Sequence, residues 1–389
     1  EEIFLFTDAL MLNTAYSIDS EKPIESALLA RKNYIPGQTQ TISKDREKNL
    51  GASKSHTDKY GNIFQVDELY GLMHGENITE SFEYARYWHG YLIFLRPLLL
   101  VLSYKRNKNI NVNTTILLIA YMSYLIIKKI NFETAVFFII GLLSVEIVLT
   151  TRALNEIIDF IIAISASIAI LLKKDTNKNV GAIFFIVGSI TSFMDLLTEP
   201  LITLGLPLII YMLLMQKQRS SIKQDLIDFA RICFLWGMGY ALTWLMKWIL
   251  VSLIYNKDII HNALQQAKFR STGMKQYGYL TVIGKNLRFL SPTVISINLA
   301  LIIIYSIIKL IKNRNGKINA KRNLYTTIPF ICSGILPFIW YLALRQHSYI
   351  HTFFTYKILI ITIISIFIIV DKILEPENKG NENERRKDY

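Results

Sequence analysis

The chain has 389 residues, of which 52% are apolar and only 19% are charged, with a mean hydropathy of +0.31. This composition excludes a disordered chain and argues against a soluble domain, which carries about 25% charged residues. The net charge of +13 does not indicate a nucleic-acid partner, because basic residues gather in the cytoplasmic loops of membrane proteins. Cys233 and Cys332 lie in apolar segments, which predicts free thiols and no disulfide framework.

The N-terminal region 1–87 is polar, with 14 acidic and 9 basic residues, and apolar segments follow it. Most of these segments have about 15–20 residues, the length that crosses a membrane as a helix. They are 88–104, 114–127, 132–149, 157–172, 180–194, 200–215, 226–254, 291–311, 324–344 and 353–370. The sequence therefore predicts an all-α polytopic membrane protein with about nine transmembrane helices.

The distribution of Lys and Arg between the loops predicts the orientation. If the C-terminal tail is cytoplasmic, the inner segments hold 18 Lys and Arg in 52 residues, whereas the outer segments hold 11 in 65. The density is about twice as high inside, as the positive-inside rule requires. We therefore expect a multi-pass protein of the plasma membrane, with residues 1–87 extracytoplasmic and the tail cytoplasmic.

Segment 88–104 is expected to lie along the membrane surface or to re-enter it. It is short, it is bordered by interfacial aromatics, and Arg96-Pro97 in its middle suits a lipid-facing span poorly. With this segment outside, an upstream helix missing from the sequence would carry the N-terminal region across the membrane. The expected parts are an extracytoplasmic domain (1–113), six membrane helices (114–254), an extracytoplasmic loop (255–290), three membrane helices (291–370) and a disordered tail (371–389).

Several charged residues fall at the outer ends of the predicted spans, where they would line an external cavity. Ionisable groups inside a membrane are costly, so their position is informative. For each one alone, snorkelling or a loop ion pair is the alternative. The members of this group are Glu146, Arg152, Asp159, Asp195 and Glu199.

Three further motifs contain candidate site residues. Asp8, in the segment 6–13 (FTDALMLN), is either a helix N-cap or a general base facing the cavity. In the segment 84–91 (YARYWHGY), Arg86 and His89 would bind a phosphate group, with Tyr87 and Trp88 lining the cavity. The alternative for that segment is an interfacial aromatic belt.

The third motif, 340–356 (WYLALRQHSYIHTFFTY), brings Arg345, His347 and His351 together, with Lys357 just inside the last helix. The two histidines are four residues apart and share a helix face, but no third ligand or HExxH pattern completes a zinc site. Binding of an anionic lipid head group is the preferred interpretation, and an aromatic belt is the alternative.

These segments resemble the GT-C superfamily of integral-membrane glycosyltransferases, in the branch that uses polyprenyl-phosphate sugars. The resemblance also extends to uncharacterised Firmicutes-type membrane proteins. It implies that Asp8, just outside a first span, is the catalytic base, and that segment 88–104 is a juxtamembrane helix. It also aligns Lys128-Lys129 with the basic end of the second span. In the segment 198–208 (TEPLITLGLPL), Glu199 replaces the Lys-Gly pair that the family often carries.

The expected function is transfer of a sugar from a polyprenyl-phosphate donor to a glycan, lipid or protein acceptor of the cell envelope at the external face. Asp8 would deprotonate the acceptor, and the Arg, His and Lys side chains named above would stabilise the phosphate leaving group. A divalent cation is left open. The alternatives are a non-catalytic transporter or assembly subunit for lipid-linked glycans, and an inactive relative of GT-C enzymes.

The predicted topology places positions 54 and 268 outside the cell. Single cysteines introduced there should react with a membrane-impermeant thiol reagent applied to intact cells. Protection of both positions until the cells are lysed would contradict the orientation derived from the loop charges.

Overall fold

Helices form nearly all of the regular structure, because backbone groups surrounded by lipid must be hydrogen-bonded within their own segment. The protein is represented by a computed structural model that describes residues 2–34, 69, 71–75, 77, 80–218, 221–272, 277–314, 318 and 320–376. Six described helical stretches are long and apolar enough to cross a membrane. These findings confirm an all-α multi-pass membrane architecture.

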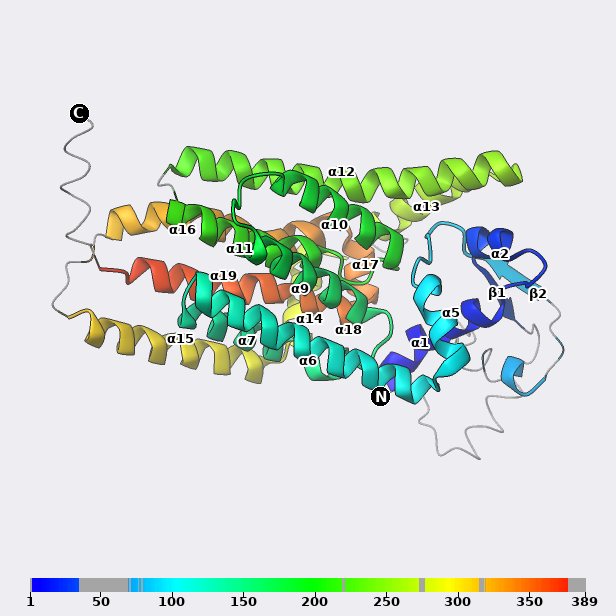
Figure 1. Cartoon of the computed structure of the whole chain (residues 1–389), viewed down its shortest axis with the longest axis horizontal. Coiled ribbons are helices and arrows are strands. Elements are labelled where there is room, and N and C mark those ends of the chain that lie inside the picture. Colours follow the sequence, from blue (N-terminus) through cyan, green and yellow to red (C-terminus); the bar gives the residue numbers. More distant parts are fainter. Residues whose placement is uncertain are drawn as a thin grey trace.

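The chain begins with a small cap. It contains α1 (Glu2–Tyr16), α2 (Pro23–Leu29) and α5 (Leu92–Val101), and one antiparallel sheet of β1 (Arg31–Tyr34) and β2 (Glu80–Glu83). Arg31 pairs with Glu83 across the sheet and also forms an ion pair with Glu25 at 3.0 Å. Figure 1 shows the cap at one end of the helical bundle and the end of the last helix, α19 (Ile360–Ile373), at the other. The ten residues of α5 extend about 15 Å, which is too short to span a membrane core of about 30 Å.

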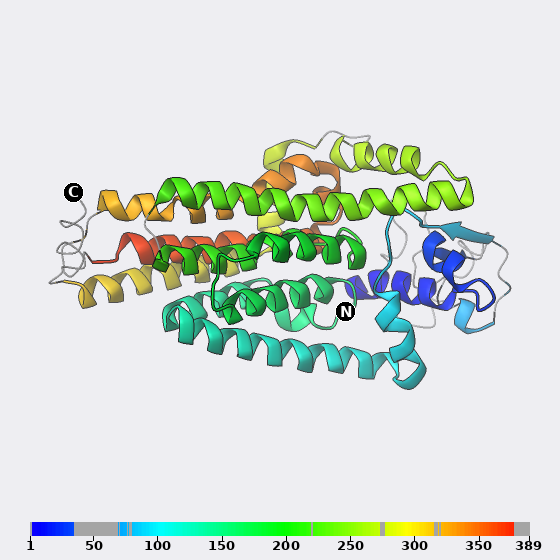
Figure 2. The same cartoon turned by 45° about the horizontal axis from the view of Figure 1, so that its top comes forward.

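The bundle consists of longer helices and several short ones. They are α6 (Tyr104–Lys129), α7 (Phe132–Ser144), α8 (Ile147–Thr150), α9 (Glu156–Leu172), α10 (Val180–Met194), α11 (Leu201–Gln218), α12 (Ile222–Tyr255), α13 (Ile259–Thr272), α14 (Tyr279–Phe289), α15 (Pro292–Lys312), α16 (Ala320–Ala343), α17 (Arg345–Ile350), α18 (Thr352–Thr355), the 3₁₀ helix η1 (Tyr356–Leu359) and α19 (Ile360–Ile373). The 34 residues of α12 continue past the bundle and run beside the cap (Figures 1 and 2).

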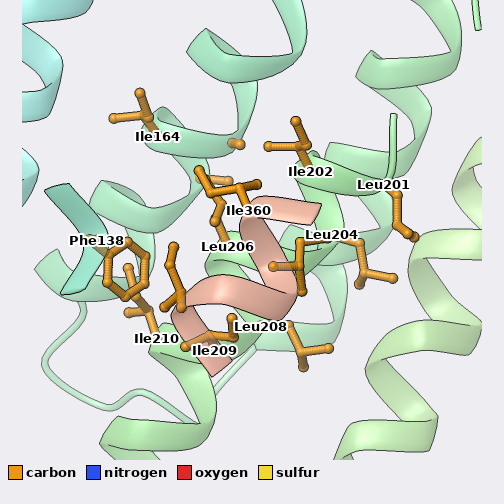
Figure 3. Packing of buried hydrophobic residues seen from close by; sticks show 14 of the residues in the cluster. Phe138, Ile164, Leu201, Ile202, Leu204, Leu206, Leu208, Ile209, Ile210 and Ile360 are labelled. Atoms are coloured by element: carbon orange, nitrogen blue, oxygen red, sulfur yellow. The ribbon is translucent and has the colours of Figure 1, made fainter. Parts of the chain in front are cut away.

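The central helix is α11, whose residues 201–215 are all buried. Figure 3 shows its leucines and isoleucines packed against Phe138 of α7, Ile164 of α9 and Ile360 near the start of α19. A helix that is apolar on all sides can be enclosed by other helices or contact lipid, and the burial of residues 201–215 shows that α11 is enclosed by protein. The helix ends that flank α11 are therefore held in place by its packing.

Two boundaries differ from the sequence prediction. Segment 105–113, expected as a loop, is helical, because α6 begins at Tyr104 with the Ser103 hydroxyl capping it. A disordered tail is expected from residue 371, but α19 continues to Ile373. Asp371 in this helix accepts hydrogen bonds from Tyr305 and Lys309. Hydropathy marks where lipid begins, whereas a helix continues as long as its caps and neighbours support it. Residues 377–389 lie outside the described part of the chain.

The expected number of nine spans stays a prediction. The helices α7, α9 and α10 have 13, 17 and 15 residues, which corresponds to about 20–26 Å. They are therefore shorter than the core of an average bilayer, although their sequences are strongly apolar.

Glycines allow α10 and α12 to cross in close contact. A Cβ atom on Gly188 would lie 2.1 Å from the Trp236 carbonyl oxygen, and one on Gly239 would lie 2.1 Å from the Phe185 carbonyl oxygen. We expect Gly188→Ala to lower the free energy of unfolding by about 1–3 kcal/mol, because the helix backbones must separate. Thermal unfolding in detergent measures this change.

Gly237 provides the matched control. It lies on α12 between the two contacts, and a Cβ atom there would meet nothing within 4 Å. Gly237→Ala should leave stability unchanged or raise it by up to about 1 kcal/mol, since alanine favours helix. Equal losses for Gly188→Ala and Gly237→Ala would contradict the importance of the close crossing.

Candidate functional site

Asp8 is buried where the cap meets the bundle. Its side chain is 1% exposed, and its Oδ1 accepts a hydrogen bond of 2.8 Å from the Leu154 backbone N–H. Its Oδ2 accepts from the Tyr104 hydroxyl and lies 3.3 Å from Lys108 Nζ. Burial raises the pKa of Asp8, and these three partners act in the opposite direction. Asp8 therefore joins α1 to the start of α6 and to the loop before α9.

A tight acidic turn, residues 195–199, connects α10 to α11. The Asp195 carboxylate accepts hydrogen bonds from the Leu197 N–H at 2.8 Å, the Thr198 N–H at 2.9 Å and the Thr198 hydroxyl at 2.6 Å. An aspartate that bonds the backbone two and three residues ahead favours such a turn. Leu197 adopts a left-handed φ of +66°, which costs about 1–3 kcal/mol and requires firm support from its surroundings.

Two further carboxyl groups lie against this turn. Asp159, in the first turn of α9, accepts from the Glu199 N–H at 3.2 Å, and its Oδ2 lies 3.2 Å from the Thr198 hydroxyl oxygen, whose proton is donated to Asp195. Glu199 is 0% exposed, and neither of its carboxyl oxygens has a hydrogen-bond partner among the described residues. Burial raises the pKa of Asp195 to about 6. Burial, and then the charges of Asp159 and Asp195, raises the pKa of Glu199. The three carboxyl groups therefore form a cluster that can hold protons near neutral pH.

His347 connects this acidic turn to the loop helix α13. Its Nε2 lies 2.8 Å from the Leu197 carbonyl oxygen, and its Nδ1 lies 2.6 Å from Nη1 of Arg270. Burial, followed by the nearby charges of His351 and Arg270, holds the pKa of His347 well below its usual range. Both ring nitrogens are engaged, so the neutral ring has no free N–H for the phosphate expected from the sequence.

His89 is engaged in the same way. Its Nε2 donates to the Tyr84 carbonyl oxygen at 3.1 Å, so its Nδ1 accepts from the Tyr91 hydroxyl at 2.9 Å. Burial lowers the pKa of His89 to about 3. The adjacent Gly90 approaches α10 so closely that a Cβ atom would lie 2.3 Å from the Phe193 ring. The geometry thus favours a positioning role for His89 over the expected binding of phosphate.

Lys357 and Glu146 belong to a second polar group, in which Lys357 is buried and Glu146 is exposed. Lys357 forms an ion pair with Glu156, and both side chains are at most 2% exposed. The Tyr356 hydroxyl donates to Glu146 at 3.0 Å. A buried ion pair that is hydrogen-bonded maintains its geometry but leaves little charge for a ligand. The positive charge of Lys357 is therefore already balanced by the Glu156 carboxylate.

The remaining expected residues lie at the edges of the site. Arg152 is exposed, and the half-buried Arg345 lies 4.6 Å from the centre of the Tyr279 ring. His351 stacks on Phe354, and Trp88 donates to the Thr243 carbonyl oxygen at 2.6 Å. The structure thus brings Asp159, Asp195, Glu199 and His347 together, whereas no described contact joins them to Asp8.

Sequence reasoning did not identify Arg270, Tyr104, Lys108 or Lys247. Lys247 is buried in α12 and donates to the Leu28 carbonyl oxygen of the cap at 2.6 Å. A lone lysine inside a long apolar segment was the available signal for it, because such a charge requires a partner. Arg270 lies in a polar helix without a motif, so no sequence signal distinguished it from its neighbours.

The described residues contain no group of three or more His, Cys, Asp and Glu side chains arranged to hold a metal ion. Comparison of the chain with known protein families, with curated proteins and with solved structures found no match. The chemistry of the site must therefore be inferred from its geometry.

The buried histidines make stability dependent on pH. An unfolded histidine has a pKa of about 6.5, whereas burial lowers the pKa of both His89 and His351 to about 3. Between these values the unfolded chain binds more protons, so each histidine should reduce stability by about 1.4 kcal/mol for each unit of falling pH. Thermal unfolding in detergent between pH 7.5 and 5 measures the effect.

The carboxyl groups with raised pKa stabilise the folded chain as the pH falls, which opposes the effect of the histidines. A substitution is therefore needed to isolate the contribution of one histidine. His89→Gln retains a donor and an acceptor for Tyr84 and Tyr91 but removes the titration. The variant should lose less stability on acidification than the parent chain does. An unchanged pH dependence would show that His89 binds a proton as readily in the folded chain as in the unfolded chain.

Proposed function

We propose that this chain is a multi-pass plasma-membrane glycosyltransferase that moves a sugar from a polyprenyl-phosphate donor to an envelope acceptor at the external face. The observation that supports this proposal is the gathering of buried carboxyl groups and a guanidinium at the cap end of the bundle. A carboxylate can accept a proton from the acceptor, and a cation can stabilise a phosphate leaving group. This part of the molecule therefore has both kinds of group that the reaction needs.

The position of the site favours surface chemistry over transport. Asp159 lies in the first turn of α9, Asp195 caps the end of α10, and Glu199 precedes the start of α11. His347 lies in α17, ahead of the last long apolar stretch. Secondary transporters bind their substrates near the bilayer midplane, between broken helices. Polar groups at helix ends beneath a cap instead suit an enzyme whose acceptor arrives from outside.

In the proposed reaction, the acceptor hydroxyl attacks the anomeric carbon of the donor. The new carbon–oxygen bond forms while the bond from that carbon to the phosphate oxygen breaks, and the electron pair leaves with the phosphate. The hydroxyl proton passes to a carboxylate, which we assign to Asp8. Residues 1–87 would be extracytoplasmic and the tail cytoplasmic, and nine spans would cross the bilayer.

One observation favours a second candidate, a non-catalytic relative that serves as a scaffold or an assembly subunit for lipid-linked glycans. Both carboxylate oxygens of Asp8 already have partners, namely the Leu154 N–H on one side and Tyr104 and Lys108 on the other. Such an aspartate can also be a purely structural clamp. Activity and stability measurements on matched variants separate the two functions.

Asp8→Asn should abolish sugar transfer, because general-base catalysis contributes about 10²–10⁴-fold to a rate. The amide retains an acceptor for Leu154 but loses the charge opposite Lys108, so stability should fall by only about 1–3 kcal/mol. Transfer of labelled sugar from a polyprenyl-phosphate donor by the purified chain, together with thermal unfolding, measures both effects.

Tyr104→Phe is the matched control, since it removes one hydrogen bond to Asp8 and retains the carboxylate. It should lower stability and leave measurable transfer. If Asp8→Asn transfers sugar as fast as the parent chain, Asp8 is a structural clamp and another group is the base. Absence of transfer by the parent chain would favour the second candidate.

A further inference from the structure

Arg270 lies at the site without a carboxylate partner. Its half-buried side chain projects from α13, and none of the described acidic groups comes within 4.0 Å of it. Its neighbours are neutral: His347 accepts from Nη1 at 2.6 Å, and the Tyr87 ring centre lies 6.0 Å from Cζ. The negative charge of Asp195 acts on the hydroxyl groups of Tyr87 and Tyr240, but no described ion pair joins Asp195 to the Arg270 guanidinium. A guanidinium partly removed from water requires compensation, and a bound anion would supply it.

His347 holds this guanidinium in one orientation. A carbonyl oxygen can only accept, so the 2.8 Å contact with Leu197 places the ring proton on Nε2. The lone pair of Nδ1 is then directed at Nη1 of Arg270. A guanidinium has five N–H donors; this contact uses one of them, and the Tyr84 hydroxyl accepts another. The remaining donors include those that form the planar fork that matches phosphate oxygens.

A second arginine lies on the same aromatic group. Arg86 stacks with its Cζ 4.9 Å from the centre of the Tyr84 ring, and its Nη1 donates to Asn262 of α13 at 2.9 Å. Its Nε is buried and has no hydrogen-bond partner among the described residues. Burial raises the pKa of the Tyr87 phenol, and the positive charges of Arg270 and Arg86 both act to lower it. Asp195 acts on the same phenol, but no described ion pair joins either arginine to a carboxylate. The like charges of the two arginines repel each other, and an anion between them would relieve this repulsion.

From this geometry we infer that Arg270, held by the neutral His347 and assisted by Arg86, forms a binding site for a phosphate ester between α13, α17 and segment 84–91. This inference rests on the proposed function, since the phosphate would be that of the lipid-linked donor. It assigns the principal contact to Arg270 and makes His347 a positioning residue. A lipid head group and a soluble phosphate compound present the same chemistry, so the test includes both.

The experiment measures binding of farnesyl phosphate, uncharged farnesol and inorganic phosphate to the purified full chain in neutral phosphatidylcholine nanodiscs by calorimetry. Farnesyl phosphate should bind at least about tenfold more tightly than farnesol, because charge-assisted contacts to the phosphate are lost with the alcohol. Tighter binding of farnesyl phosphate than of inorganic phosphate indicates a lipid ligand. Equal binding of the two indicates a soluble phosphate compound at the same site.

Arg270→Gln should weaken binding of farnesyl phosphate by about tenfold or more, and Arg270→Lys by less, because lysine retains the charge without the planar fork. Arg288→Gln on the neighbouring helix α14, where the side chain is exposed, is the matched control and should bind like the parent chain. Unchanged binding by Arg270→Gln would overturn the inference.

The histidine variants test the positioning role separately. His347→Gln supplies a carbonyl acceptor for Arg270 and an N–H donor for Leu197, so it should retain binding within about threefold. His347→Leu supplies neither and should weaken binding as much as Arg270→Gln does. If both variants weaken binding equally while thermal unfolding shows both to be folded, His347 contacts the ligand itself and the positioning role fails.

The outcomes for the site and for the proposed function are distinguishable. Loss of phosphate binding in Arg270→Gln, without sugar transfer by the parent chain under any assay, would retain the anion site and reject the glycosyltransferase. Sugar transfer by the parent chain that is unaffected in Arg270→Gln would retain the glycosyltransferase and reject the anion site at Arg270.

Discussion

The burial of α11 on all sides is the constraint on which the rest of the structure depends. Residues 201–215 are buried because α9, α10, α12, α16 and α19 pack around α11, although a helix with no polar face could equally contact lipid. A Cβ atom on Gly205 would lie 2.3 Å from Ile361, which shows how closely α19 approaches. The residues immediately before α11 form the acidic turn, and this turn is therefore fixed at the end of the bundle and sealed from solvent.

Burial of three carboxyl groups in this position costs desolvation free energy, which contacts with the surrounding residues must offset. The turn satisfies Asp195 through backbone N–H groups, and the raised pKa of Asp195 and Glu199 shows that burial favours their protonated forms. His347 supports the strained Leu197 from the other side by donating to its carbonyl oxygen. Because His347 remains neutral, it supports the turn without adding a buried charge. Its other nitrogen then orients Arg270, so one residue links the acidic and the basic halves of the site.

The cap is attached by a small number of buried polar contacts. Asp8 joins α1 to α6 and to the loop before α9, and Lys247 joins α12 to the end of α2. Removing one partner of such a contact leaves the other buried and unpaired, which costs several kcal/mol. These contacts therefore determine how the cap is placed over the helix ends, and with it the position of segment 84–91 and of Arg86.

The amino-acid sequence by itself determined that the chain is a multi-pass helical membrane protein, because membrane insertion and helix formation follow from local properties. Apolar segments of membrane length require helices whose backbone is satisfied internally. The charges of Asp159, Asp195 and Glu199 at segment ends indicated where polar groups would gather. The positions of helix ends within polar sequence, as at Tyr104 and Ile373, were predicted poorly because capping and neighbouring helices decide them.

Only the tertiary structure decided which polar groups meet. Asp8 and Tyr104 are 96 residues apart, and Arg270 and His347 are 77 apart, so no periodicity relates them. The sequence identified His89 and His347 as candidate cations, but the folded environment keeps both neutral, since burial and hydrogen bonding determine protonation. Arg270 became prominent only when the fold showed that none of the described carboxylates pairs with it. A charge gains its role from its partners, and those partners come from distant parts of the chain.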